Sequence, residues 1–139
     1  MEIRKAIVSE IPKVESFYEL VDYKPGVNKS DFLLITELTG NIVGAVRLVQ
    51  EQNELVLRGM MIHPDFQRRG IGSKMLKICA EHMGDQICYC IPYDYLEEFY
   101  NEVGFKKTEA NQAPIFLQTR LNSYLNDGMD TIIMRKDSK

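Results

Sequence analysis

The amino-acid sequence predicts one domain of the α/β class, with a mixed, mostly antiparallel sheet of about six to seven strands and helices on both faces. Two observations predict this fold. In the first half of the 139 residues, short apolar runs are separated by polar turns, as in an antiparallel meander. In the middle, an apolar run over 55–62 leads through a Gly-containing turn into a helical pattern and then into a second apolar run at 86–91. Such a strand–helix–strand unit implies a right-handed parallel crossover.

The chain is expected to begin with a strand over 2–8 and a helix after it. Ser9 is a suitable N-cap residue, and Pro12 is tolerated in the first helical turn. The apolar face of this helix consists of Ile11, Val14, Phe17, Tyr18 and Val21. Residues 22–30 are loop by composition.

The next part of the chain is expected to be an antiparallel meander. Apolar strands are predicted at 32–38 and 42–49, joined by a short loop at 39–41 that contains Gly. Residues 51–53 turn the chain into the central strand over 55–62. Three strands in succession therefore lead into the middle of the sheet.

A long helix should follow the central strand. Its apolar face consists of Ile71, Met75, Leu76, Cys79, Ala80 and Met83. Gly84 is a suitable residue to follow the helix end. The compact apolar strand at 86–91 is closed by Pro92.

The C-terminal third is expected to alternate helices and strands. Asp94 is a candidate N-cap with Glu97 as its capping-box partner, and this helix should end at Gly104. Its buried stripe is Leu96, Phe99, Tyr100 and Val103. A strand over 105–109 comes next.

A short helix opening at Pro114 should then precede the last strand, over 129–135. Its apolar face is Leu117, Leu121, Tyr124 and Leu125. The residues after the last strand, 136–139, are expected to fray.

Composition excludes several kinds of protein. A net charge of −3 argues against non-specific nucleic-acid binding through a broad basic face. No apolar run approaches the ~18 residues of a membrane span and the N-terminus has no signal-peptide core, so a cytoplasmic protein is expected, with no membrane partner. The three cysteines, Cys79, Cys88 and Cys90, are expected to be reduced core thiols; without a CxxC pair no metal site is expected.

The turn between the central strand and the long helix carries the clearest chemical signal. Gly70 and Gly72 allow the backbone to approach a ligand, and the helix that starts at this turn has unpaired N–H groups that favour an anion. Arg68 and Arg69 add positive charge, and Ser73 adds a hydroxyl. This arrangement predicts a phosphate cradle, although a turn of this kind also serves simple packing of a helix on a sheet.

The segment from Gln67 to Gly72 resembles the Arg/Gln-x-x-Gly-x-Gly/Ala motif of the GNAT superfamily of acyl-CoA-dependent N-acetyltransferases. The resemblance extends upstream through 62–66 and downstream to 99–105, which resembles a second recurrent segment of that family. Both segments occur in the family's order, and the resemblance covers essentially the whole chain.

The resemblance implies where acetyl-CoA would bind. The two parallel strands would splay apart and admit the pantetheine arm, whose amides would pair with the backbone of Met60, Met61 and Ile62. The pyrophosphate would lie in the cradle formed by Gln67, Arg68, Arg69, Gly70, Ile71, Gly72 and Ser73. The backbone N–H near Ile62 would polarise the thioester carbonyl.

Tyr100 matches the family tyrosine that protonates the leaving thiolate, and a phenol with a pKa near 10 suits that role. The simpler interpretation is a core aromatic residue on an amphipathic helix. Some relatives also carry an Asn that contacts the cofactor seven residues earlier, where this chain has Tyr93.

No general base is identified. Histone-type relatives place a Glu where this chain has Val56; Glu54 and His63 are nearby, and a chain of water molecules is an alternative. Arg58 is the one charged residue inside an apolar strand, and it should either pair with an acidic side chain or meet an anionic group of the acceptor.

The expected function is an N-acetyltransferase that moves an acetyl group from acetyl-CoA directly to a primary amine in a ternary complex. The alternative is a CoA-binding sensor or interaction module without turnover, and a longer acyl donor is a third option. Homodimers are common in the family, so a dimer is also considered.

The acceptor is expected to be a small-molecule or peptide amine. The acidic balance favours a cationic amine, while the region 22–30, too short for the family's second helix, suggests an open groove. Phe116, Gln118 and Arg120 on the helix after Pro114 are candidates to shape the acceptor pocket, although residues on an exposed helix face are the simpler interpretation.

Overall fold

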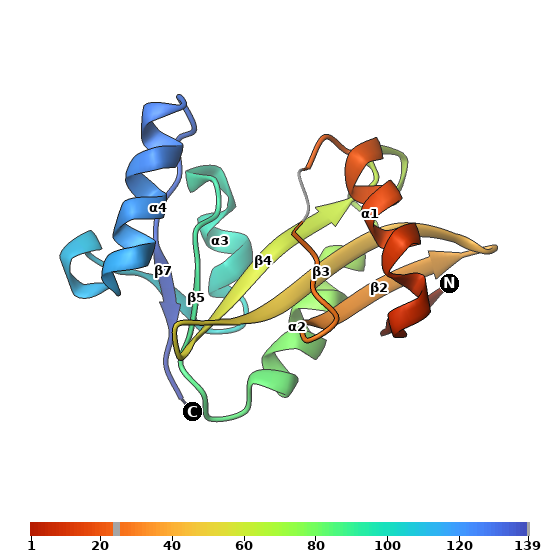
Figure 1. Ribbon diagram of the computed structural model, residues 1–139, viewed down its shortest axis with the longest axis horizontal. Helices are drawn as coiled ribbons and strands as arrows, with labels where there is room; N and C mark the ends of the chain where they lie inside the picture. The colour runs from red at the N-terminus through yellow and green to blue at the C-terminus, as the bar shows by residue number, and fades with distance from the viewer. Residues whose placement is uncertain (24–25, 139) are drawn as a thin grey trace.

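The computed structural model describes residues 1–23 and 26–138 and shows a seven-stranded sheet in the order β1-β2-β3-β4-β5-β7-β6 (Figure 1). The strands are β1 (Glu2–Lys5), β2 (Phe32–Leu38), β3 (Asn41–Glu51), β4 (Glu54–Ile62), β5 (Cys88–Cys90), β6 (Phe105–Lys107) and β7 (Met134–Lys136). The α-helices of this described part are α1 (Ile11–Leu20), α2 (Ile71–Met83), α3 (Glu97–Asn101) and α4 (Ile115–Asn126). None of them is long and apolar enough to cross a membrane.

The sheet is mixed and mostly antiparallel, as the sequence predicts. β4 and β5 are the parallel pair, and they are registered only through Leu55 opposite Cys88 and Val56 opposite Tyr89. All other neighbouring strands run antiparallel. Beyond Val56 the two parallel strands separate, and in Figure 1 they diverge from their lower ends.

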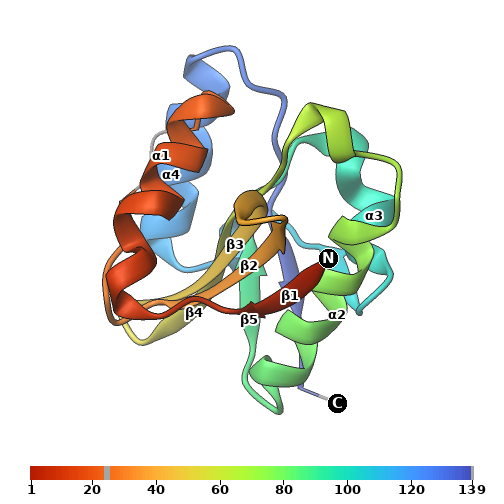
Figure 2. The same cartoon turned by 90° about the vertical axis from the view of Figure 1, so that its right-hand side faces the viewer.

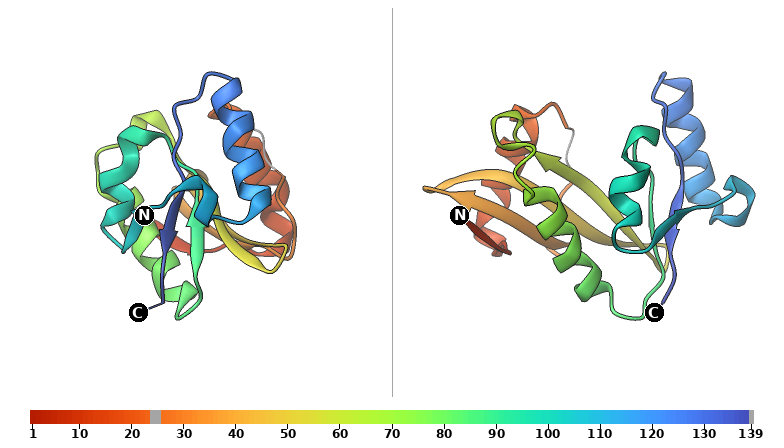
Figure 3. Two further views of the ribbon diagram at one scale, coloured as in Figure 1. Left: turned by 90° about the vertical axis from the view of Figure 1, so that its left-hand side faces the viewer. Right: turned by 180° about the vertical axis from the view of Figure 1, so that it is seen from behind.

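Helices cover both faces of the sheet. α1 and α4 lie on one face and α2 and α3 on the other (Figures 2 and 3). The largest apolar cluster packs α2 and α3 against the centre of the sheet, with fully buried Met75, Leu76 and Phe105 among its members. Smaller clusters hold α1 against β2 and β3 and α4 against β4 and β5. The amphipathic patterns in the sequence are therefore matched by burial.

The two hairpins of the meander close through tight two-residue turns. Thr39 and Gly40 have φ of +47° and +83°, and Gln52 and Asn53 have φ of +48° and +67°. Two consecutive positive φ angles match the right-handed twist of the flanking strands. The predicted three-residue loop at 39–41 is thus one residue too long, because Asn41 already belongs to β3.

At the N-terminus the predicted strand over 2–8 is too long and Ser9 is not the N-cap of α1. Residues 8–10 form a 3₁₀ turn, and Glu10 occupies the N-cap position. The Glu10 carboxylate accepts hydrogen bonds from the Ile7 N–H at 3.0 Å and from the Arg4 guanidinium at 2.7 and 2.8 Å. This local network turns the chain after β1. Such side-chain hydrogen bonds to the backbone compete with the predicted strand and cap, and the spacing of apolar residues does not reveal them.

The capping box predicted at Asp94 and Glu97 is also wrong. Asp94 begins a 3₁₀ turn, α3 starts only at Glu97, and no side chain caps either element. The backbone N–H of Asp94 instead donates to the Asp130 carbonyl at 2.8 Å. A contact with a distant segment therefore replaces the local cap.

The C-terminal strands are shorter than predicted and shifted. Of the residues 129–135, only 134 and 135 lie in β7, and Thr131 forms an isolated bridge with Tyr93. Lys136, which the sequence predicts to fray, is the last residue of β7 and only 4% exposed, because it pairs with both Cys88 and Phe105. The predicted strands over 86–91 and 105–109 shrink to β5 and β6.

The predicted loop over 22–30 contains no helix in its described residues, 22–23 and 26–30. Lys24 and Pro25 lie outside the described residues, as does Lys139 among the residues expected to fray. The loop is held by Asp31, whose carboxylate accepts from the Asn28 N–H at 3.0 Å and from Arg47 at 3.2 Å. α4 begins directly after Pro114, as the sequence predicts. It buries Leu117 and Leu121 but leaves Leu125 47% exposed.

Candidate active site

β4 contains a β-bulge beside its opening from β5. On the β3 side, Arg47 lies opposite Arg58 and Ala45 opposite Met61, so the two residues Gly59 and Met60 face a single residue of β3. Gly59 has a φ of +66°, which L side chains rarely adopt. A bulge bends its strand and increases the local twist, which directs the end of β4 away from β5.

Tyr18 of α1 fixes the bulge. Its hydroxyl donates to the Gly59 carbonyl at 2.8 Å. A Cβ at position 59 would lie 2.7 Å from the Tyr18 hydroxyl oxygen. Sequence reasoning missed both residues, because periodicity assigns Tyr18 only to an apolar helix face. The available signal was Gly59, since a glycine inside an apolar strand marks a bulge or a close backbone approach.

A cavity of 370 Å³ occupies the space between the separated strands. One wall is the β4 segment from Val56 to Met61, and the other is β5 with the residues that follow it. α3 contributes Tyr100, and α4 contributes Arg120 and Tyr124. The cavity is thus bounded by elements from both faces of the sheet.

Tyr100 is brought to this cavity by α3. Its side chain is 4% exposed and stands edge-on to the rings of Phe99 and Phe105, with centroids 4.9 and 5.9 Å away. Burial raises the pKa of the Tyr100 phenol well above 10. The phenol therefore stays protonated at neutral pH and can donate a proton or a hydrogen bond into the cavity.

The predicted pantetheine-binding residues lie at the exposed edge of β4. Met60 and Ile62 direct their side chains toward α2, whereas Met61 packs toward α1. On one side, Met61 and Ile62 pair with β3. On the other side, the described residues provide no strand partner after Val56, so the backbone groups of this edge face the cavity.

The predicted phosphate cradle lies at the start of α2. Arg68 and Gly70 adopt left-handed φ angles of +64° and +78°, and the residues from Gln67 to Gly70 are exposed. The Lys74 N–H makes the first helical bond, to the Gly70 carbonyl at 3.2 Å. The backbone N–H groups of Ile71, Gly72 and Ser73 therefore precede the helical ladder and are oriented for an anion.

Two side-chain contacts hold the cradle, one to β4 and one to the turn that follows β4. The Gln67 amide donates to the Ile62 carbonyl at 3.0 Å, and the Arg69 guanidinium lies 5.2 Å from the ring centroid of Phe66. A Cβ at Gly72 would lie 3.4 Å from the Phe99 ring. Gly72 thus also serves close packing of α2 on α3, which is the simpler role of such a turn.

The structure does not bring the candidate general bases to the cavity. Val56 is buried against α4, and His63 uses its Nδ1 to accept the Asp65 N–H at 3.1 Å in the turn after β4. Neither Glu54 nor His63 lines the cavity. Among the described residues that do, the one carboxylate is that of Asp22.

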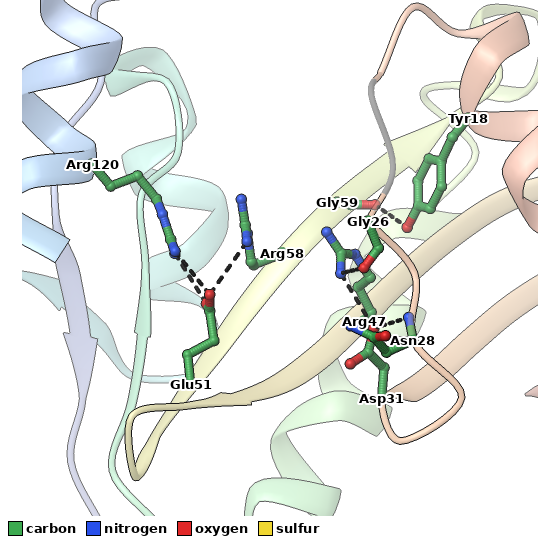
Figure 4. Close-up of polar contacts among 9 residues, drawn as sticks. All are labelled: Tyr18, Gly26, Asn28, Asp31, Arg47, Glu51, Arg58, Gly59 and Arg120. Atoms are coloured by element: carbon green, nitrogen blue, oxygen red, sulfur yellow. Dashed lines mark hydrogen bonds and ion pairs between the residues drawn. The ribbon is translucent and has the colours of Figure 1, made fainter. Parts of the chain in front are cut away.

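Arg58 and Arg120 meet at Glu51, on the α1 and α4 face of the sheet (Figure 4). Arg120 donates from both terminal nitrogens to Glu51, at 2.8 and 3.0 Å, and Arg58 approaches the same carboxylate at 3.5 Å. Burial opposes ionisation of Glu51, but the hydrogen bond from Arg120 and the charges of both arginines outweigh it and lower its pKa below 4.5. The acidic partner expected for Arg58 is therefore present, although Arg120 holds it more closely.

The other two residues of α4 that were candidates for the acceptor pocket have local roles. Gln118 donates to the Ala113 carbonyl at 2.7 Å at the start of the helix, and the Phe116 ring lies 5.6 Å below the Arg120 guanidinium. Neither Phe116 nor Gln118 lines the cavity.

The three cysteines are buried free thiols. Burial raises the pKa of Cys79 and of Cys88 to about 12 and that of Cys90 well above 9. No group of three or more potential metal ligands occurs among residues 1–23 and 26–138.

Comparison with known proteins agrees with this geometry. The family model described as an acetyltransferase (GNAT) domain matches residues 5–114. The UPF0039 protein C11D3.02c of Schizosaccharomyces pombe is 26% identical over 113 residues, which cover 77% of this chain and 67% of the yeast protein.

Solved structures share the fold at low identity. A GNAT-family acetyltransferase from Streptococcus pneumoniae has a TM-score of 0.74 at 15% identity, covering 99% of both chains. N-acetylglutamate synthase from Neisseria gonorrhoeae, complexed with coenzyme A and N-acetyl-glutamate, has a TM-score of 0.68 at 19% identity. That match covers 97% of this chain and 34% of the synthase, so the chain spans about a third of that protein.

Proposed function

Because the chain belongs to the GNAT acetyltransferase family, we propose that it transfers an acetyl group from acetyl-CoA to a primary amine by direct attack in a ternary complex. The observation that carries the proposal is the separation of β4 from β5 after Val56, beside an anion-binding helix start. An open strand edge suits the amides of the pantetheine arm of coenzyme A, and a phosphate cradle suits its pyrophosphate.

The edge of β4 would hold the pantetheine arm. Met60, Met61 and Ile62 would offer backbone groups to its amides in the manner of an added strand, although the Ile62 carbonyl already accepts from Gln67. The N–H groups at Ile71, Gly72 and Ser73 would bind the pyrophosphate, assisted by the charges of Arg68 and Arg69. The gonococcal synthase, which holds coenzyme A on the same fold, supports this assignment.

Tyr100 would act as the general acid. As the amine nitrogen attacks the thioester carbonyl, the carbon–sulfur bond breaks and the departing thiolate takes a proton. The buried phenol of Tyr100 lies in the cavity and remains protonated, so it can supply that proton, and water that enters as the products leave would return a proton to the phenolate. The ammonium proton of the acceptor would leave through water, because neither Glu54 nor His63 lines the cavity and Asp22 is the one carboxylate among its described lining residues.

Reduced, buried thiols favour a cytoplasmic setting, and we propose that residues 1–139 act there as one domain. The second candidate is a CoA-binding module without turnover, favoured by the lack of an evident base. The two differ only in whether free thiol is released when acetyl-CoA and an amine are both present.

The test is thermal unfolding with and without acetyl-CoA, for the native protein and a Gly72→Asp variant. At ~100 times its dissociation constant, acetyl-CoA should add about 2.7 kcal/mol of stability. The new carboxylate should abolish the shift by repelling the pyrophosphate at the start of α2. Gln86→Glu, which adds one negative charge beyond the other end of α2, is the matched control and should keep the shift. No shift in the native protein at millimolar acetyl-CoA would overturn the proposal and the CoA-module alternative together.

A further inference from the structure

We propose that the acceptor is a small amine that also carries a carboxylate, and that Arg58 binds this carboxylate. The inference deepens the proposed function and rests on it, because it concerns the acceptor side of the same cavity. It is based on the charges around the cavity, the hydrogen-bond partners of two arginines and the position of Arg58 on β4.

The cavity wall carries more positive than negative charge, although the protein as a whole is acidic. Arg58 and Arg120 line it, and Asp22 is the one acidic residue among its described lining residues. Glu51 lies behind the two arginines and supplies a single carboxylate to both. The two guanidinium groups share this one carboxylate, and Asp22 forms no ion pair with either of them among the described residues, so one positive charge has no ion-pair partner of its own.

That charge belongs to Arg58. Both terminal nitrogens of Arg120 donate short hydrogen bonds to Glu51 in a bidentate arrangement. Arg58 makes a single contact of 3.5 Å from one nitrogen, to an oxygen that Arg120 already occupies. Its side chain is 26% exposed, so its remaining N–H groups can reach a ligand.

The position of Arg58 is unfavourable for a purely structural residue. It lies directly opposite Arg47 across the β3–β4 pair, and like charges at such positions destabilise a sheet. Arg47 is neutralised by its own buried partner, Asp31, at 3.2 Å. Glu51 is satisfied by Arg120 alone, so the fold gains little from a second arginine beside it; an incoming anion gives Arg58 a partner.

The rest of the cavity fits a small amine. Its volume is 370 Å³, and Tyr23, Tyr93 and Tyr124 are among its lining residues, a residue type that suits a cationic group. Arg58 precedes Met60 by two residues in β4, which separates their Cα atoms by at most roughly 7 Å. A carboxylate at Arg58 would therefore place an amine one amino-acid length away beside the open edge of β4. A polyamine would instead meet repulsion at Arg58.

The test compares matched acceptors with the intact protein and acetyl-CoA. The panel consists of free amino acids and dipeptides, each paired with its C-terminal amide, together with spermidine; thiol release gives kcat and KM. For the native protein, kcat/KM should be roughly tenfold to a hundredfold higher for the carboxylate form than for the amide, mainly through KM. In Arg58→Met this ratio should fall to near one, and Arg58→Lys should restore part of it.

Two controls separate this inference from a general loss of structure. Arg135→Met removes an arginine that pairs with Asp137 outside the cavity, and should leave the native preference in place. The acetyl-CoA-dependent thermal shift of Arg58→Met should equal that of the native protein, which shows that the cofactor side is intact.

If no amine in the panel is acetylated, product binding provides a second readout. N-acetylated amino acids and their amides are then added with coenzyme A, and the thermal shift of the carboxylate form should be larger only while Arg58 is present. Equal use or equal binding of acid and amide, or a preference for spermidine, overturns the carboxylate inference while acetyl transfer itself can stand. Failure to bind acetyl-CoA at all marks failure of the proposed function instead.

Discussion

The Tyr18 hydroxyl donates to the carbonyl of Gly59 at 2.8 Å, which joins α1 to the bulge in the middle of β4. The two residues are 41 positions apart in the chain. This bond fixes the backbone where β4 bends away from β5, and so it supports the opening in which acetyl transfer is proposed.

Removing this hydroxyl should weaken the fold. In Tyr18→Phe, a fully buried side chain loses its donor and the Gly59 carbonyl loses its partner, at a cost of about 1–2 kcal/mol in the free energy of unfolding. Urea denaturation measures the loss. Tyr95→Phe, at a 75% exposed position, is the control and should change stability little. Equal stabilities of native protein and Tyr18→Phe would contradict the stabilising role of this bond.

Gly59→Ala should be more damaging, because two effects combine. The φ of +66° is costly for a residue with a Cβ, and that Cβ would lie 2.7 Å from the Tyr18 oxygen. We expect a loss of about 2–4 kcal/mol, measured by urea denaturation. Gly128→Ala isolates the first effect, because Gly128 has a φ of +82° with no atom within 4 Å. Combined with Tyr18→Phe, the effect of Gly59→Ala should be less than additive; strict additivity would show that the contact is unimportant.

Tyr100→Phe should impair chemistry and spare cofactor binding. The ring and its packing against Phe99 and Phe105 remain, but the proton donor is lost, so kcat should fall roughly 100-fold. The thermal shift with acetyl-CoA should persist. Since burial raises the pKa of Tyr100 well above 10, ionisation of this phenol should not lower the native kcat between pH 8 and 10. A kcat within twofold of native would make Tyr100 a core aromatic and nothing more.

The Glu51–Arg120 pair should give a pH-dependent contribution to stability. The pKa of Glu51 is lowered below 4.5 in the folded protein, so its contribution is complete above that pH and disappears as the pH falls through the lower folded value. At pH 7, Glu51→Gln should be roughly 0.5–2 kcal/mol less stable than the native protein. Below pH 4.5 the two curves of unfolding free energy against pH should converge.

The control for this experiment is Glu102→Gln, at an exposed position. Its stability should parallel that of the native protein at every pH. A stability gap between the native protein and Glu51→Gln that widens on acidification would contradict a lowered pKa for Glu51.

The three thiols should be unreactive in the folded protein. Burial raises the pKa of Cys79 and Cys88 to about 12, and that of Cys90 well above 9. At pH 8, a disulfide-exchange reagent should therefore label none of them within minutes, and all three after guanidinium is added. Rapid labelling of Cys90, which lines the cavity, would show that the cavity opens to solvent more than its burial indicates.

Local sequence patterns correctly predicted the helices and strands that depend on the spacing of apolar residues. The 3.6-residue period gave α2 with its end at Gly84, and alternating apolar runs gave β2 to β4. These predictions succeeded because burial of one helix face, or of a sheet interior, requires a regular spacing of apolar residues along the chain. The predictions that failed, at Ser9, Asp94 and Lys136, all concern the ends of helices or strands. At these ends a local side chain, a hydrogen bond to a distant segment or a strand pairing decides the structure.

The site divides in the same way. The proposed cradle is one continuous segment, so its glycines and arginines could be predicted from the local sequence. The bulge at Gly59, the hydroxyl of Tyr18 that holds it and the convergence of Arg58 and Arg120 on Glu51 involve α1, β3, β4 and α4. The sequence marks Arg58 as unusual, but it does not identify the partners of this residue.

The sequence by itself determined the family and the order of strands and helices along the chain, because these depend on contiguous residues and on their periodicity. The tertiary structure decided where β4 parts from β5 and which charges surround the acceptor side of the cavity. Those features arise from pairs of residues far apart in the chain, such as Glu51 with Arg120, 69 positions apart. Their meeting depends on how the sheet twists and how α4 packs on it, which no local pattern specifies.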